Sequence, residues 1–113
     1  MTWLNDAEVQ TVEDKQMEAL AALKQSLTSA VQKHMDNTAK ERNFDDILSL
    51  CTYATSAKPK FKAEGQAGVE WRDEVWMYCY AELDKVLSGL RTAPTPEELI
   101  EELPRPVWPN DPT

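Results

Sequence analysis

Residues 6–40 contain neither glycine nor proline, the two residues that most often end a helix. Apolar side chains recur along this stretch at spacings of three and four, which is the period of one face of an α-helix. The sequence therefore predicts one long amphipathic helix over about residues 6–40. Its apolar positions are Val9, Val12, Met17, Leu20, Leu23, Leu27, Ala30, Val31 and Met35.

Part of this apolar face repeats every seven residues, at Leu20, Leu27 and His34 and again at Leu23 and Ala30. A narrow stripe with this period suits packing against another long helix. Two interpretations follow. The helix folds back on its own domain, or it pairs with a copy of itself and makes the protein a homo-oligomer through its first helix.

A second, short helix is predicted over about residues 44–56. Asn43 followed by Asp46 resembles a helix-capping arrangement, and apolar residues then recur at helical spacing. The pair Lys58 and Pro59 disfavours helical geometry at the lysine, so we expect a turn that reverses the chain. The apolar positions of this helix are Phe44, Ile47, Leu48, Cys51 and Ala54.

A third helix is predicted over about residues 60–88, with Pro59 near its start and Gly89 as a left-handed stop. Its large apolar side chains cover more than one face, so we expect it to lie centrally or to meet a partner. Gly65 and Gly68 each cost about 1 kcal/mol in a helix interior relative to alanine. We interpret them as a point where another backbone approaches closely.

The composition changes after Gly89. Thr95, Pro96 and Glu98 form a capping box with proline in the first turn, which predicts a fourth, short helix over about residues 96–103. Repeated prolines then predict an extended tail over residues 104–113. This tail is either held against the body by Trp108 or is itself a ligand for another protein.

These elements predict an all-α fold, a small antiparallel helical bundle or hairpin in which the first helix packs on the third and the two short helices close the ends. No segment shows the alternating pattern that a strand requires. Residues 1–103 form a single helical domain in this prediction. The expected core is Leu20, Leu23, Leu27, Val31, Phe44, Ile47, Leu48, Cys51, Val75, Trp76, Cys79, Leu83 and Val86.

The chain is acidic, with 20 acidic and 12 basic residues and a formal net charge of −8. Nonspecific binding to nucleic acid or anionic lipid needs clustered Lys and Arg, so we expect neither partner class, and a protein partner instead. The sequence contains no apolar stretch of about 18 residues, so no membrane-spanning helix is predicted. Cys51 and Cys79 form no CxxC pair and follow no signal peptide, which favours reduced thiols in the cytoplasm.

The sequence offers no catalytic or metal-binding pattern, so we expect neither enzyme activity nor a cofactor. His34 is the only histidine and has no second His or Cys three or four residues away to share a metal. Cys51 and Cys79 lie on apolar helical faces, which is typical of structural thiols. The carboxylates of Glu97, Glu98, Glu101 and Glu102 are expected to form a solvated helix face.

Two stretches favour protein binding. Trp71, Arg72, Trp76 and Tyr80 combine aromatic and guanidinium groups of the kind that dominate protein interfaces. An exposed Trp108 between prolines would form a second docking element. The alternative for the tryptophans is a place in the core, which is the commoner fate of Trp at helical spacing.

Several short motifs also recur in a known class of proteins. They are Phe44 and Asp45 ahead of Ser49, Tyr53 with Ala54, Phe61 with Glu64, Trp71-Arg72-Asp73 with Trp76 and Cys79, Pro94 to Leu99, and Leu103-Pro104 with Trp108-Pro109. On these motifs the stretch from about Val31 to Pro109 resembles small tailed-bacteriophage proteins associated with tail and tail-fibre assembly.

The resemblance implies a noncatalytic protein that binds a tail or tail-fibre polypeptide. It would act in the host cell cytoplasm as an assembly chaperone, or remain in the virion tail as a structural component. A third interpretation is an acidic inhibitor of a host nucleic-acid-binding protein. Lys58, Lys60, Lys62 and Arg72 interrupt the row of carboxylates that such an inhibitor needs.

Overall fold

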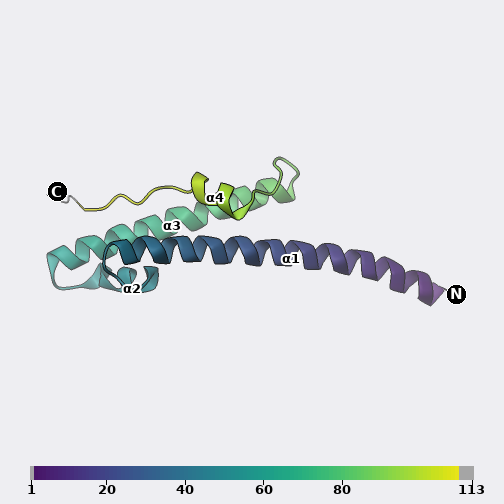
Figure 1. Cartoon of the computed structure of the whole chain (residues 1–113), viewed down its shortest axis with the longest axis horizontal. Coiled ribbons are helices and arrows are strands. Elements are labelled where there is room, and N and C mark those ends of the chain that lie inside the picture. Colours follow the sequence, from purple (N-terminus) through teal and green to yellow (C-terminus); the bar gives the residue numbers. More distant parts are fainter. Residues whose placement is uncertain (1, 110–113) are drawn as a thin grey trace.

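The computed structural model describes the backbone of residues 2–109 and the side chains of residues 14–109. The described residues are all-α, as predicted, and contain no strand. In Figure 1, α1 and α3 lie side by side and antiparallel, with α2 at one end and α4 over the other half of α3. The elements are α1 (Thr2–Glu41), α2 (Ile47–Thr52), the 3-10 turn η1 (Tyr53–Thr55), α3 (Pro59–Leu87) and α4 (Pro96–Glu102).

Local signals in the sequence define most helix ends. Pro59 lies in the first turn of α3, and Gly89 follows that helix with a φ of 76°. The Thr95 side chain accepts a hydrogen bond from the Glu98 amide, and the Glu98 carboxylate accepts one from the Thr95 amide, each at 3.1 Å. This capping box confirms the predicted start of α4.

The predicted cap of the second helix is wrong in one respect. Asn43 adopts a φ of 72° and belongs to the turn that ends α1, a conformation that asparagine tolerates better than most residues. The Phe44 amide then donates to the carbonyl of Ala39 at 3.0 Å. Asp46 caps α2 instead, because its side chain accepts from the Ser49 amide at 2.7 Å. The second helix is consequently shorter than predicted.

The two interior glycines of α3 mark a close helix contact, as predicted. A Cβ at Gly65 would overlap the backbone of Tyr53 and Ala54 in η1. A Cβ at Gly68 would lie 2.7 Å from Cγ of Leu50 in α2. Both glycines are buried, and at Gly65 the backbone of α3 approaches η1 too closely for any side chain to fit without a backbone shift.

The core lies where α1, α2, α3 and α4 meet. Val31, Ile47 and Val75 are buried as predicted, whereas Leu48 is 61% exposed and was wrongly assigned to the core. The glycine contact presents Leu50, rather than Leu48, to α3, and this turns Leu48 outward. The buried core consists of Val31, Met35, Ala39, Ile47, Leu50, Trp71, Val75, Leu99 and Leu103.

Towards the α2 end of α1, large side chains bridge the space between α1 and α3, whereas α1 makes more backbone-level contacts with α2 and α4. The imidazole of His34 meets the indole of Trp71 edge to face, with ring centroids 6.0 Å apart. Arg42 forms an ion pair with Glu64. The predicted packing of the first helix on the third therefore exists, but through these long side chains.

Residues 103–109 form a C-terminal strap, an extended segment held against the body. The Trp71 indole N–H donates to the carbonyl of Pro104 at 2.8 Å. Trp108 meets Trp71 edge to face at a centroid distance of 6.3 Å, and the Arg42 guanidinium lies 4.7 Å from the centre of the Trp108 ring. Of the two predicted alternatives for this tail, attachment through Trp108 is confirmed.

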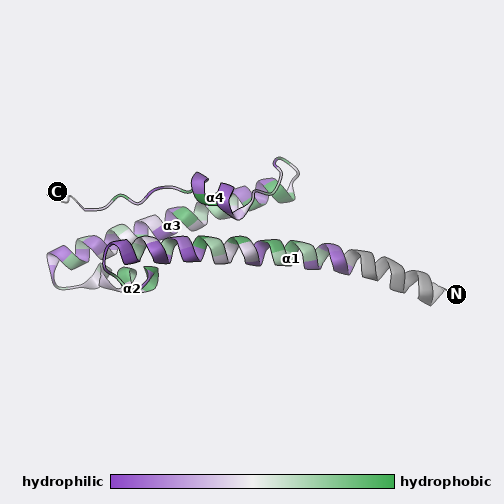
Figure 2. Ribbon diagram, in the orientation of Figure 1, coloured by the Kyte–Doolittle hydropathy of each residue, from purple (hydrophilic) through white to green (hydrophobic). Residues whose placement is uncertain are grey.

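The molecule is elongated, with principal extents of 72 × 24 × 19 Å and a Cα radius of gyration of 19.4 Å. A compact domain of this length has a radius of about 13 Å. The difference arises from the N-terminal arm, residues 2–19 of α1, which continues past the ends of α3 and α4 (Figure 1). Hydrophobic and hydrophilic residues alternate along the rest of α1 and along α3, as amphipathic helices require (Figure 2).

Candidate protein-binding groove

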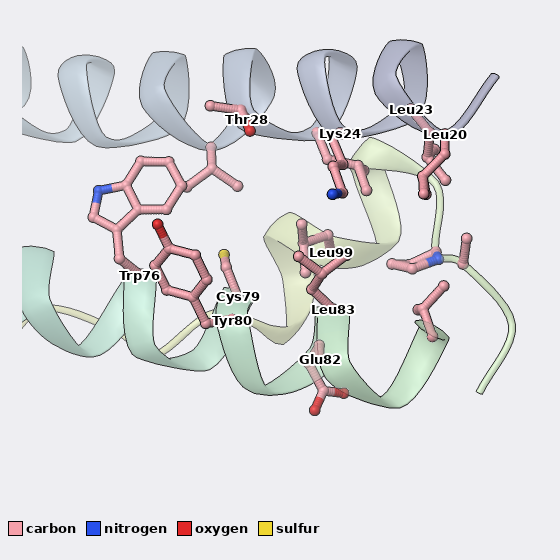
Figure 3. A pocket seen from close by; sticks show the side chains of 15 residues that line it. Leu20, Leu23, Lys24, Thr28, Trp76, Cys79, Tyr80, Glu82, Leu83 and Leu99 are labelled. Atoms are coloured by element: carbon pink, nitrogen blue, oxygen red, sulfur yellow. The ribbon is translucent and has the colours of Figure 1, made fainter. Parts of the chain in front are cut away.

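An open apolar groove of about 630 Å³ runs between α1 and α3. Figure 3 shows Leu20 and Leu23 extending from α1 at one end, Trp76 and Tyr80 rising from α3 at the other, and Leu99 of α4 between the two ends. The lining residues are Leu20, Leu23, Lys24, Leu27, Thr28 and Val31 of α1, Trp76, Cys79, Tyr80, Glu82, Leu83 and Val86 of α3, Ala93 and Pro94 of the loop, and Leu99 of α4.

Both long walls of the groove carry apolar residues in alternating steps of three and four. In α1 the positions are Leu20, Leu23 and Leu27, and in α3 they are Trp76, Tyr80, Leu83 and Leu87. Helices with this spacing pack knobs-into-holes against neighbouring helices. Tyr80 is 68% exposed and Leu87 is exposed too, so the α3 stripe continues out of the groove onto the surface.

Leu20, Leu23, Leu83 and Val86 were predicted to be core residues. Each is only half-buried, because α1 and α3 diverge here and the described part of the chain supplies no helix to fill the gap. Periodicity identified their apolar face correctly. It could not show that this face stays open, since an unfilled groove and a filled core require the same spacing.

An ion-pair network holds α4 in place beneath the groove. The Arg91 guanidinium reaches Glu82 of α3 at 2.6 Å and Glu102 of α4 at 2.8 and 2.9 Å. Lys85 adds a contact with Glu82 at 2.8 Å. In Figure 3 the Glu82 carboxylate points away from α1, so this charge does not enter the groove.

The same network shifts two pKa values. Hydrogen bonds from Arg91 and Tyr78 lower the pKa of Glu102 to about 2. Burial, together with the hydrogen bond that the Tyr78 hydroxyl donates to Glu102 at 2.6 Å, raises the pKa of Tyr78 to about 12. Both groups therefore keep their charge states at all ordinary pH values, which suits a structural connection between α3 and α4.

The five predicted partner-binding residues do not form one surface. Trp76 and Tyr80 line the groove, whereas Arg72 is exposed on another part of α3. Trp71 is 1% exposed, so of the two alternatives for the tryptophans it takes the place in the core and is not accessible to a partner. Trp71 and Trp76 lie about 140° apart around the helix, which directs one into the core and the other into the groove. Trp108 is half-buried against Trp71.

The remaining polar candidates occupy structural positions. Burial lowers the pKa of His34, which contacts Trp71. Burial raises the pKa values of the Cys51 and Cys79 thiols, which disfavours the reactive thiolate form, and neither cysteine is in a disulfide. Within residues 14–109, no three His, Cys, Asp or Glu side chains converge on a site that could hold a metal ion.

Comparison of the chain with protein-family models, with curated proteins and with solved structures found no match. Among the described helices, none combines the length and the apolar character needed to cross a membrane.

Proposed function

We propose that the protein is a noncatalytic bacteriophage protein that binds a tail or tail-fibre polypeptide during assembly, in the manner of a chaperone. The observation that carries the proposal is the open apolar groove between α1 and α3. Binding of apolar polypeptide requires an accessible apolar surface of this kind.

The dimensions and the lining of the groove support the proposal. Its volume of about 630 Å³ provides room for several apolar side chains of a bound segment. Trp76 and Tyr80 are side chains of the type that contribute most to protein interfaces. Apolar side chains of an unassembled fibre segment would be shielded from water between these aromatic rings and the leucines of α1.

The sequence supports the phage context. The resemblance to tail and tail-fibre assembly proteins extends over about residues 31–109, which includes the whole α3 wall of the groove. The formal net charge of −8 favours solubility in a protein that exposes apolar side chains. The proposed place of action is the host cell cytoplasm.

The test is affinity capture of the tagged protein from phage-infected cells, with one variant in the groove and one matched control. Tyr80→Glu places a charge in the groove at an exposed position, and Leu48→Glu makes a comparable change at an exposed position away from it. We expect the wild-type protein and Leu48→Glu to retain a tail or tail-fibre polypeptide that Tyr80→Glu loses. Thermal unfolding followed by circular dichroism should show that both variants are folded.

Mass spectrometry of purified virions separates the two assembly roles. Absence of the protein from virions is the expected result for a chaperone, and its presence would identify a structural tail component instead. Capture of a host nucleic-acid-binding protein, with no tail or fibre polypeptide, would overturn the proposal in favour of an acidic inhibitor.

A further inference from the structure

The backbone of the N-terminal arm projects beyond the other helices (Figure 1). Residues 14–19 are all exposed, including Met17 at 70%. The arm is about 27 Å long at 1.5 Å per residue, and helices in proteins gain most of their stability from tertiary packing. Met17 extends the helical face of Leu20, Leu27 and Val31, the face that lines the groove.

The groove, in turn, lacks a helix that would fill it. It is an apolar channel between two helices with knobs-into-holes spacing, and it lacks the additional helix that this spacing accommodates. The α1 wall from Leu20 to Val31 is about 17 Å long, which is shorter than the arm. One helical arm could therefore fill the whole groove.

We propose that the protein forms a two-fold symmetric dimer in which the N-terminal arm of each copy fills the groove of the other. The arm and the α1 wall are consecutive parts of one helix. Antiparallel pairing of the two α1 helices about an axis near Ala19 places residues 7–18 of one copy along residues 20–31 of the other. The interface is isologous: the same two surfaces meet twice, so both arms are packed and both grooves are filled.

Charge complementarity supports this register. Asp14 lies on the arm and Lys24 lines the groove, and both residues are exposed. They are equally distant in sequence from Ala19, on opposite sides of it. The two-fold axis therefore brings Asp14 of one copy beside Lys24 of the other, twice in each dimer. Opposite charges at the edge of an antiparallel helix pair fix its register and orientation.

The dimer also regulates the groove, a consequence that rests on the proposed function. The arm of the second copy and a tail or tail-fibre polypeptide would require the same apolar surface. The dimer is then a resting form whose groove is covered until assembly polypeptide displaces the arm. The dimer itself depends only on the purified protein, so it is tested separately from the function.

Sedimentation equilibrium of the purified full-length chain over a concentration series tests the dimer. We expect a reversible dimer for the wild-type protein. Lys24→Glu alone and Asp14→Lys alone each place like charges in contact twice, and each should raise the dissociation constant about tenfold or more. The double variant with both substitutions recreates two opposite-charge pairs and should restore dimerisation.

Lys15→Glu is the matched control, because it makes the same change of charge about 100° around the helix from Asp14, away from the predicted pair with Lys24, and should leave dimerisation unchanged. A wild-type protein that is monomeric at all concentrations would overturn the proposal. So would a double variant that dimerises no better than the single variants. Restored dimerisation without capture of any tail or fibre polypeptide would uphold the dimer and reject the function.

Discussion

Two glycine residues illustrate how much a single missing side chain can determine. At Gly65 an added Cβ meets the backbone of Tyr53 and Ala54, which cannot move without shifting η1. At Gly68 it meets only the side chain of Leu50, which can rotate. The sequence predicted a close contact at both positions. It could not show at which of them an added side chain costs more, because that depends on which atoms lie opposite.

This difference leads to a prediction for two matched variants. Gly65→Ala should lower the free energy of unfolding by about 2 kcal/mol, because the overlap outweighs the better helix propensity of alanine. Gly68→Ala should cost less, since Leu50 can adjust. Urea unfolding followed by circular dichroism measures both values. A Gly65→Ala protein as stable as the wild type would contradict the glycine contact.

His34 gives the folded protein a specific pH dependence. Burial lowers its pKa in the folded state below the usual value of 6.5, so the unfolded chain binds the proton more tightly. The free energy of unfolding should therefore decrease as the pH falls through 6.5 towards the folded-state pKa, and this contribution should be complete below it. His34→Gln should remove that contribution. Urea unfolding at pH 8 and pH 5.5 measures the free energy of unfolding of the wild type and of His34→Gln. An equal change between the two pH values in both proteins would contradict the role of His34.

At the scale of elements, the helices were predictable because their ends depend on neighbouring residues. Pro59, Gly89 and the capping box at Thr95 act within one turn of the helix they limit. The assignment of Asn43 failed because a left-handed conformation and a cap both favour asparagine. Which of these applies depends on where α1 ends, and that is fixed by tertiary packing.

The attachment of α4 depends on Arg91, which contacts carboxylates on two helices. Arg91→Gln should loosen α4, because Glu82 and Glu102 would then face each other with Lys85 alone to compensate. Amide hydrogen exchange in residues 99–103 should become several-fold faster than in the wild type. Lys85→Gln is the control and should have little effect on α4, because the ion pair of Lys85 is with Glu82 of α3. Equal protection of α4 in the Arg91→Gln protein would contradict this role.

At the scale of the whole molecule, the sequence identified the apolar faces but not their arrangement. Leu20, Leu23, Leu83 and Val86 were correctly recognised as apolar positions, yet they line an open groove. Trp71 and Trp76 were grouped on one surface, yet they point in different directions. Both outcomes depend on how far apart α1 and α3 lie, and large side chains between them set that distance.

The elongated shape can be tested in solution. At concentrations well below its dissociation constant, the Lys24→Glu variant should give a radius of gyration near the Cα value of 19.4 Å in small-angle X-ray scattering. Its maximum dimension should approach the longest principal extent of 72 Å. A radius near 13 Å, as for a compact domain, would mean that the N-terminal arm folds back onto the body.

The edge-to-face contact between Trp71 and Trp108 gives the C-terminal strap a signal of its own in the circular dichroism spectrum. Two indoles 6.3 Å apart and inclined by 60° share their electronic transitions, so the pair absorbs circularly polarised light differently from two separate rings. Release of the strap would abolish this exciton signal while leaving every helix intact. The protein thus carries an intrinsic optical label that distinguishes a detached tail from an unfolded domain, with no dye attached.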